Sequence, residues 1–385
     1  MLKIGFTHFL LAVIFVSFVP LGELSAQAAS HPGVSARNAV LMEQESGRML
    51  FGKHAHEKRR IASITKIMTA VLAIEEGDLD KKVTISRNAA NTEGSSLYLQ
   101  KGEHVRLKDL VYGLMLRSGN DAAVAIAEAV GGSVEGFTRL MNQKAAQIGM
   151  TDTRFANPHG LDDHQKMYST AYDMALLMRY AMKNKTFREI TSTKVHRVDD
   201  PDGTGTLVWL NKNKLLRMYP YATGGKTGYT RMAKRTLVST AKKDGLALIA
   251  VTLNDPDDWD DHMNLFDWGF RTFDLKTVVE KGIVPGIENA FYSGKVYVKQ
   301  AFRYPVTNDE KDELHTSLTL YEPPADGKWK NGKAPSPVGM VHVLLDDEKV
   351  ADVPVYFREG ENEDKGFWDF FRDVFSFIAG KRYDG

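Results

Sequence analysis

Strand-like and helix-like segments follow an order along this chain that strongly restricts its fold. Two short strand-like runs, residues 38–43 and 48–51, flank the turn-forming sequence Glu-Ser-Gly at 45–47. Two longer β-branched runs, residues 236–241 and 246–253, are separated by another turn that contains glycine. Each pair predicts a β-hairpin. Hairpins at both ends of a long helical segment predict one antiparallel sheet with a helical insertion, which is an α+β fold.

Four segments between the two hairpins have the apolar periodicity of amphipathic helices. They are residues 64–75, 107–117, 121–130 and 171–182. Together with the hairpins they define a first domain, residues 34–275, which carries every candidate catalytic motif described below.

The sequence beyond this domain changes in character. After a linker containing Gly and Pro at 282–286, short strand-like runs alternate with turns rich in Pro, Gly and Asp. The runs are residues 295–299, 314–320, 338–345 and 350–357. They predict a small all-β domain over residues 285–358, in which no motif indicates catalysis.

The N-terminal segment has the features of a secretory signal peptide. One positive charge, Lys3, precedes an apolar run at residues 9–19, and a small-x-small sequence ends at Ala28. The apolar run is shorter than the roughly 20 residues that a membrane-spanning helix needs. We therefore predict that residues 1–28 are removed on export. An uncleaved membrane anchor is the alternative.

The C-terminal segment combines many aromatic residues with helical spacing. Between residues 367 and 378, apolar side chains recur at i, i+3, i+4 and i+7, and the opposite face is polar. Such a helix is about 18 Å long, too short for the roughly 30 Å hydrocarbon core. We predict that residues 364–382 form an in-plane membrane anchor. The alternative is a helix that packs on its own domain, because the polar face is mixed in sign rather than basic.

The absence of cysteine narrows the chemistry. The chain can form no disulfide, no Cys-ligated metal centre, no thiolate nucleophile and no lipid-modified cysteine. Lys and Arg number 50 against 49 Asp and Glu, and a net charge of +1 argues against a surface for nucleic acid. Any nucleophile must therefore be Ser, Thr, Lys or a carboxylate.

A Ser-x-x-Lys pattern lies at the start of the first predicted helix. Because residues i and i+3 share a helix face, the amine of Lys66 can reach the hydroxyl of Ser63. Lysine can serve as the base for serine only if burial or a second cation lowers its pKa. A second copy, Ser239 and Lys242, lies on a strand-like run, where i and i+3 face opposite sides. The context therefore favours Ser63 and Lys66.

Two further short motifs lie at the ends of predicted elements. One is a Ser-x-Asn turn, and the other is a Lys-Thr-Gly sequence that occurs once: Ser118 and Asn120, and Lys226, Thr227 and Gly228. Taken alone, the first favours helix capping and the second a surface turn. The alternative is that these motifs take part in catalysis or substrate binding. Lys226 can supply the second cation, Thr227 can bond a substrate carboxylate, and Gly228 admits the backbone of a ligand.

Ser-x-x-Lys, Ser-x-Asn and Lys-Thr-Gly in this order are the signature of penicillin-binding proteins and serine β-lactamases. On these motifs the sequence resembles the D-alanyl-D-alanine carboxypeptidases, the low-molecular-weight penicillin-binding proteins, over nearly its whole length. The matching blocks are residues 61–69, 117–123, 157–161, 169–173 and 225–230. Within the family the chain resembles the sporulation-specific carboxypeptidases of bacilli.

The resemblance implies a penicillin-binding, serine β-lactamase-like fold and acyl transfer on the stem peptides of peptidoglycan. Ser63, deprotonated by Lys66, would attack the carbonyl between the two terminal D-alanines. Ser118 and Lys66 would carry protons, and Asn120 would orient Lys66 and the substrate amide. Water would then hydrolyse the acyl-enzyme, and β-lactam antibiotics would trap the same serine. No metal or cofactor is implied.

The resemblance also implies how the substrate is held. Lys226 and Thr227 would bind the terminal carboxylate, beside Gly228, and the backbone N–H groups of Ser63 and Tyr229 would hold the oxyanion. Many family members have histidine where this chain has Tyr229, so a side-chain role for that histidine does not carry over.

A second departure concerns an arginine that some members use to hold the substrate carboxylate. The corresponding region, residues 254–262, is acidic in this chain, and Arg235 is the candidate replacement. We interpret the acidic run as a solvated loop. A cation site is the alternative, although the run lacks the glycine of an EF-hand loop.

Two other functions are weighed against a carboxypeptidase. A class A β-lactamase would carry an E-x-x-L-N pattern between the second and third motifs, and residues 189–192 do not fit it. A wall-binding protein with an inactive site would lack a catalytic group, whereas Ser63, Lys66, Ser118 and Lys226 are all present. The sequence therefore favours an exported, membrane-attached carboxypeptidase.

Overall fold

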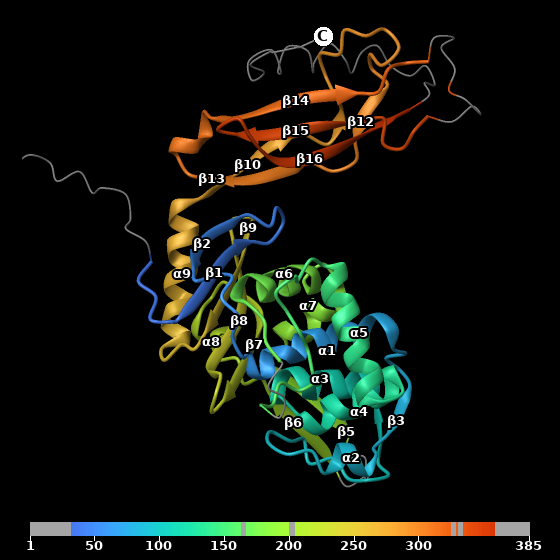
Figure 1. Ribbon diagram of the computed structural model, residues 1–385, viewed down its shortest axis with the longest axis vertical. Helices are drawn as coiled ribbons and strands as arrows, with labels where there is room; N and C mark the ends of the chain where they lie inside the picture. The colour runs from blue at the N-terminus through green and yellow to red at the C-terminus, as the bar shows by residue number, and fades with distance from the viewer. Residues whose placement is uncertain (1–31, 163–166, 200–204, 325–328, 330–333, 359–385) are drawn as a thin grey trace, which may run out of the picture. The chain divides into compact units, whose positions relative to one another are not determined.

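The computed structural model describes residues 32–162, 167–199, 205–324, 329 and 334–358 (Figure 1). The predicted signal peptide, residues 1–28, and the predicted tail helix, residues 364–382, lie outside these ranges. Within the ranges, no helix combines the length and apolar character needed to cross a membrane.

A five-stranded antiparallel sheet combines strands from both ends of the first domain (Figure 1). Its strands, in spatial order, are β2 Met49–Lys53, β1 Asn38–Glu43, β9 Leu246–Leu253, β8 Lys234–Lys243 and β7 Ala222–Thr230. Residues Asn38 and Leu253 face each other where β1 pairs with β9. The predicted sheet and the α+β fold class are therefore confirmed.

A helical insertion joins the two halves of this sheet. It holds η1 Ala62–Thr65, α1 Lys66–Glu76, α2 Arg87–Ala90, α3 Leu107–Arg117, α4 Asn120–Gly131, α5 Val134–Gln147, α6 Ala171–Ala181, α7 Lys185–Ser192 and α8 Leu215–Met218. Two small hairpins accompany the helices: β3 Lys82–Thr84 with β4 His104–Arg106, and β5 Val195–Asp199 with β6 Thr206–Leu210. The predicted first helix, residues 64–75, begins in the 3-10 turn and continues as α1. Ala62, the first residue of the turn, has a left-handed φ of 48°.

The sheet is buried on both faces, because side chains alternate along each strand. Val40 and Val251 pack with the helical insertion in one apolar cluster. Leu41 and Leu248 point the other way and pack against α9, Asp258–Thr272. Burial on both sides explains why β9 reads as a continuous apolar run instead of an alternating one.

The acidic run after β9 is not the solvated loop that we expected. Asp255, Asp258 and Asp261 are buried, and α9 begins within the run. Ser35 donates hydrogen bonds to Asp255 and Asp261, and Arg235 forms an ion pair with Asp258. Carboxylates are favourable near a helix N-terminus, and charge pattern alone cannot show which of them acquire partners. In the part of the chain that the structure describes, no group of His, Asp or Glu is arranged to hold a metal ion.

A second sheet forms from the later part of the chain. Its strands, in spatial order, are β11 Gly282–Ile283, β12 Val296–Val298, β16 Glu348–Phe357, β15 Gly339–Leu345 and β14 Leu314–Leu320. A further pair joins β10 Asp274–Val279 to β13 Phe302–Val306. The predicted linker at 282–286 thus contributes a short strand. Valines from β12, β15 and β16 form the apolar core of this sheet, as an all-β domain requires.

Candidate active site

The hydroxyl of Ser63 and the amine of Lys66 lie within hydrogen-bond distance. Ser63 is in the 3-10 turn η1, and Lys66 is the first residue of α1. In a 3-10 turn, residues i and i+3 eclipse each other, and Lys66 Nζ is 2.9 Å from Ser63 Oγ. The Lys66 side chain is fully buried, whereas Ser63 is partly exposed. The serine is therefore accessible and the amine beside it is shielded from water.

The Ser-x-Asn motif directs its side chains to the two lysines. Ser118 follows the last residue of α3 with a left-handed φ of 66°, and Asn120 is the first residue of α4. Asn120 Oδ1 accepts a hydrogen bond from Lys66 Nζ at 2.6 Å, while its Nδ2 donates to the carbonyl of Glu93. The N-cap residue of α4 is Gly119, without a side-chain capping bond. Helix capping, the alternative weighed for this motif, holds for Ser118, which is the C-cap residue of α3 through its backbone N–H. It does not account for the side-chain contacts with the lysines.

The Lys-Thr-Gly motif lies in β7, which is the terminal strand in the order of the sheet. Lys226 is 1% exposed, and its Nζ donates to Ser118 Oγ at 3.1 Å and to the carbonyl of Thr227. A Cβ added to Gly228 would lie 2.9 Å from the backbone nitrogen of Ser63. The side chain of Tyr229 is 64% exposed. The structure thus brings all three motifs together around Ser63.

Burial and neighbouring cations lower the pKa of both lysines. For Lys66, burial is the larger cause, followed by the positive charges of Lys226 and Lys212, and its pKa falls well below the ordinary range. For Lys226, burial and then the charge of Lys212 lower the pKa to about 7. Lys66 therefore loses its proton more easily than an ordinary lysine, as a lysine base requires.

Two contributors to the site were not identified from the sequence. The backbone carbonyl of His159 accepts a hydrogen bond from Lys66 Nζ at 2.7 Å. Lys212, just after β6, places a third positive charge near the two motif lysines and is 3.4 Å from Ser95 Oγ. A carbonyl leaves no signature in the residue pattern, and a single lysine between asparagines carries no motif. The family resemblance covers residues 157–161 as a block and assigns no role to any one of them.

Arg235, the candidate for holding the substrate carboxylate, has other contacts. It forms an ion pair with the buried carboxylate of Asp258, and its guanidinium lies 5.7 Å from the ring centre of Trp259. Desolvation keeps the pKa of Asp258 above its usual range even though Arg235 opposes that shift. Lys212, rather than Arg235, is the cation whose charge lowers the pKa of both Lys66 and Lys226.

The duplicate motifs lie in other environments. Ser239 is buried in β8, where it contacts the imidazole of His262, and Lys242 on the same strand is exposed. Ser86, in the second Ser-x-Asn sequence, caps α2 by accepting a hydrogen bond from the backbone of Ala89. These contacts differ from those of Ser63 and Ser118 with Lys66 and Lys226, so the environment separates the motifs that the sequence repeats.

Comparison with known protein families matches two models to this chain. Residues 25–257 match the model of D-alanyl-D-alanine carboxypeptidases. Residues 273–363 match the model of the C-terminal domain of penicillin-binding protein 5.

Individual relatives match over nearly the full chain. D-alanyl-D-alanine carboxypeptidase DacF of Bacillus subtilis is 30% identical over 94% of this chain and 95% of that protein. DacC of Escherichia coli is 31% identical over 92% of each. The crystal structure of penicillin-binding protein 5 from Haemophilus influenzae superposes with a TM-score of 0.70 at 27% identity, covering 87% of this chain and all of that one. The chain therefore belongs to the D-alanyl-D-alanine carboxypeptidase family of serine peptidases.

Proposed function

We propose that Ser63 is the nucleophile and Lys66 the general base of a serine D-alanyl-D-alanine carboxypeptidase acting on peptidoglycan pentapeptides. The contact between Lys66 Nζ and Ser63 Oγ at 2.9 Å, made by a buried lysine of lowered pKa, carries this proposal. The amine takes the serine proton as Oγ forms a bond to the carbonyl carbon of the penultimate D-alanine.

The partners of Lys66 support a base that faces the serine. A neutral amine has two N–H donors and one lone pair. Asn120 Oδ1 and the carbonyl of His159 carry no hydrogen, so they can only accept the two N–H groups. The lone pair is then left for the remaining neighbour, the hydroxyl of Ser63. This arrangement suits proton transfer from Ser63 to Lys66.

We assign the substrate to the free edge of β7. An edge strand offers backbone groups to which an extended peptide can pair. Lys226 and Thr227 then hold the terminal carboxylate, and the lack of a side chain at Gly228 leaves room beside Ser63. The backbone N–H groups of Ser63 and Tyr229 stabilise the oxyanion. The exposed phenol of Tyr229 has no part in this role.

Departure of the last D-alanine needs a proton on its nitrogen. Ser118 Oγ is bonded to Lys226 Nζ, and Asn120 connects the same turn to Lys66. We assign Ser118 and Lys66 to deliver the proton that Lys66 took from Ser63. The C–N bond then breaks, and D-alanine leaves the acyl-enzyme. Water hydrolyses the ester and regenerates Ser63. A penicillin acylates the same oxygen through its strained amide.

One assay tests this function. The protein is incubated with a peptide that ends in D-Ala-D-Ala, and released D-alanine is measured alongside covalent labelling by a fluorescent penicillin. We expect both signals, because both reactions acylate Ser63. Hydrolysis of the penicillin without release of D-alanine would contradict the proposal and favour a β-lactamase.

We propose that the mature protein acts on the outer face of the cytoplasmic membrane, and on the forespore membrane in a sporulating cell. The support is the sequence of the two termini and the resemblance to sporulation-specific carboxypeptidases, with peptidoglycan of the wall or spore cortex as the substrate. The attachment is assigned to the in-plane helix proposed for residues 364–382.

A truncation tests the attachment. A variant that lacks residues 360–385 is expected to move from the membrane pellet to the supernatant, because the aromatic face is lost. Sedimentation of cell membranes followed by penicillin labelling measures the distribution. The full-length protein is the control. If the truncated variant still sediments with membranes, the anchor is not in the tail.

A further inference from the structure

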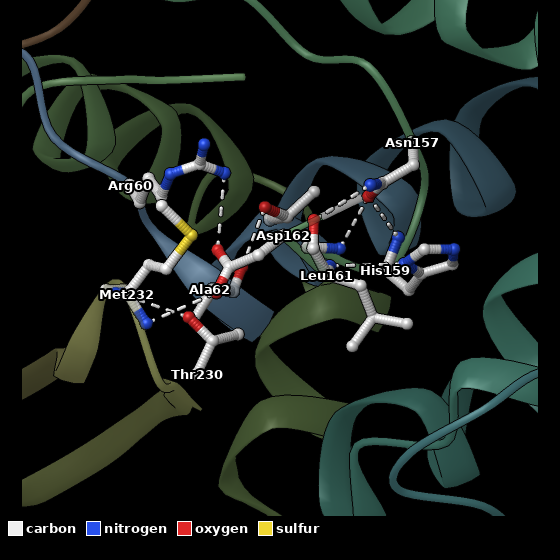
Figure 2. A network of polar contacts seen from close by, with 11 residues as sticks. Arg60, Ala62, Asn157, His159, Leu161, Asp162, Thr230 and Met232 are labelled. Carbon is white, nitrogen blue, oxygen red and sulfur yellow. Dashed lines mark hydrogen bonds and ion pairs between the residues drawn. The ribbon is translucent and has the colours of Figure 1, made fainter. Parts of the chain in front are cut away.

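Residues 157–162, in the connection between α5 and α6, form a loop whose His159 carbonyl accepts a hydrogen bond from Lys66. Figure 2 shows Asn157, His159, Leu161 and Asp162 of this loop. The side chain of Asn157 closes this loop on itself. Its Oδ1 accepts the backbone N–H of Gly160 at 2.7 Å and that of His159 at 3.3 Å, and its Nδ2 donates to the carbonyl of Leu161 at 3.1 Å. Asn157 is 2% exposed, so water does not compete easily for these bonds.

The loop is also attached to the turn that carries the nucleophile. Thr69 on α1 donates a hydrogen bond of 2.6 Å to the carbonyl of Pro158. Gly160 has a φ of 88°, and a Cβ at this position would lie only 1.9 Å from the carbonyl oxygen of Ala62. Only glycine allows such an approach. The loop backbone therefore has little freedom relative to Ser63 and Lys66.

A third connection links the end of this loop to two other segments (Figure 2). Asp162 forms an ion pair with Arg60, which precedes the nucleophile turn, and accepts a hydrogen bond from the backbone of Met232 after β7. The distances are 3.4 and 3.3 Å. The loop thus connects the nucleophile turn with the turn that follows the Lys-Thr-Gly strand.

From this geometry we infer that Asn157 is a positioning residue, which holds the His159 carbonyl so that it takes one N–H of Lys66 and leaves the lone pair toward Ser63. The inference rests on the proposed roles of Ser63 and Lys66. The bonds described here join the side chain of Asn157 to the backbone of His159, Gly160 and Leu161, so it acts on Lys66 through that backbone. Without these bonds the peptide that carries the acceptor can rotate, and Lys66 loses its fixed direction.

Two variants of nearly equal shape test this inference. Asn157→Thr retains one oxygen that can accept the N–H of Gly160, as Thr does in local turns. Asn157→Val replaces that oxygen by a methyl group. We expect Asn157→Val to be acylated by a fluorescent penicillin about 10- to 100-fold more slowly at pH 7, since small misplacements of catalytic groups have effects of this size. Asn157→Thr is expected to stay within about 3-fold of the wild type.

The pH profile of acylation distinguishes positioning from a general loss of structure. Lys66 faces the charged groups of Lys226, Lys212 and Asp121, and burial is the main cause of its low pKa. If the carbonyl moves, water enters and the pKa of Lys66 rises toward its ordinary value. The rising limb of the Asn157→Val profile should then shift to higher pH, while that of Asn157→Thr stays in place. A fall in the folded fraction lowers the rate equally at every pH.

Several outcomes would overturn the inference. Asn157→Val acylated at the wild-type rate would do so, as would an equal loss in both variants at every pH. If Asn157→Val does not fold, Thr69→Val and Thr69→Ser provide a second pair, since only serine retains the hydrogen bond to the carbonyl of Pro158. Equal rates in that pair would also contradict the inference. Failure of the proposed function is separate, because it would appear in the wild type or as labelling of Ser63→Ala.

Discussion

Replacing Ser63 by alanine is expected to abolish D-alanine release and covalent labelling by penicillin, a loss of at least about 10⁴-fold. Both reactions need an oxygen nucleophile at this position, and Lys66, Ser118 and Lys226 cannot substitute for it in forming the ester. The buried groups keep their mutual contacts, because Ser63 is only one of three partners of Lys66. Fluorescence of the labelled protein on a denaturing gel and a D-alanine assay measure the two activities.

The second Ser-x-x-Lys sequence provides a matched control. Ser239→Ala removes a serine that is equally well placed by motif but lies in β8 against His262. It is expected to be labelled like the wild type when equal amounts of folded protein are compared. Persistent labelling of Ser63→Ala, or loss of labelling in Ser239→Ala alone, would show that the nucleophile is assigned to the wrong motif.

Replacing Lys66 by glutamine is expected to slow acylation by about 10²- to 10⁴-fold, the usual contribution of a general base. The introduced amide offers two N–H donors for Asn120 and the carbonyl of His159 but has no basic lone pair. The change therefore removes proton transfer, while Asn120 and the carbonyl of His159 can still accept hydrogen bonds from the glutamine amide. Stopped-flow acylation by a chromogenic penicillin measures the rate.

The pH dependence gives this variant a second readout. In the wild type we expect acylation to rise with pH as Lys66 loses its proton, at a lower pH than for an ordinary lysine, because burial and Lys226 lower the pKa of Lys66. We expect acylation to fall again as Lys226, with a pKa of about 7, becomes neutral and no longer attracts the substrate carboxylate. Lys66→Gln should lack the rising limb and keep the falling one.

Lys242→Gln, in the second Ser-x-x-Lys sequence, is the control for this charge change. The side chain of Lys242 is exposed, so the acylation rate of Lys242→Gln and both limbs of its pH profile should match the wild type. A rising limb that survives in Lys66→Gln would assign the base to another residue.

Local patterns predicted much of the architecture, because the elements concerned bury one continuous face. The strand Leu246–Leu253 and the helix Leu107–Arg117 have the bounds that their apolar periodicity predicts. The hairpins also predicted a sheet shared between the two ends of the domain, since each hairpin alone leaves apolar faces uncovered. Prediction failed at Gly282–Ile283, where a strand too short for a periodic pattern completes the second sheet.

The acidic run after β9 shows why charge pattern alone misleads. Asp258 follows the exposed Asp257 and Asp261 follows the exposed Asp260, yet Asp258 and Asp261 are buried. Their partners, Arg235 and Ser35, lie on distant parts of the chain. A carboxylate is stable inside a protein when hydrogen bonds or an ion pair compensate for its burial. The sequence does not show which distant residues the fold will place beside it.

The sequence by itself determined the fold class and the three motifs, and it favoured Ser63 over its duplicate as the proposed nucleophile, because periodicity and helical spacing are local properties. The tertiary structure decided how the motifs act on one another. It placed Lys226 and Lys212 where their charges lower the pKa of Lys66, and it brought a backbone carbonyl at His159 to the same amine. These effects depend on burial and on distances between remote segments, and no local pattern contains them.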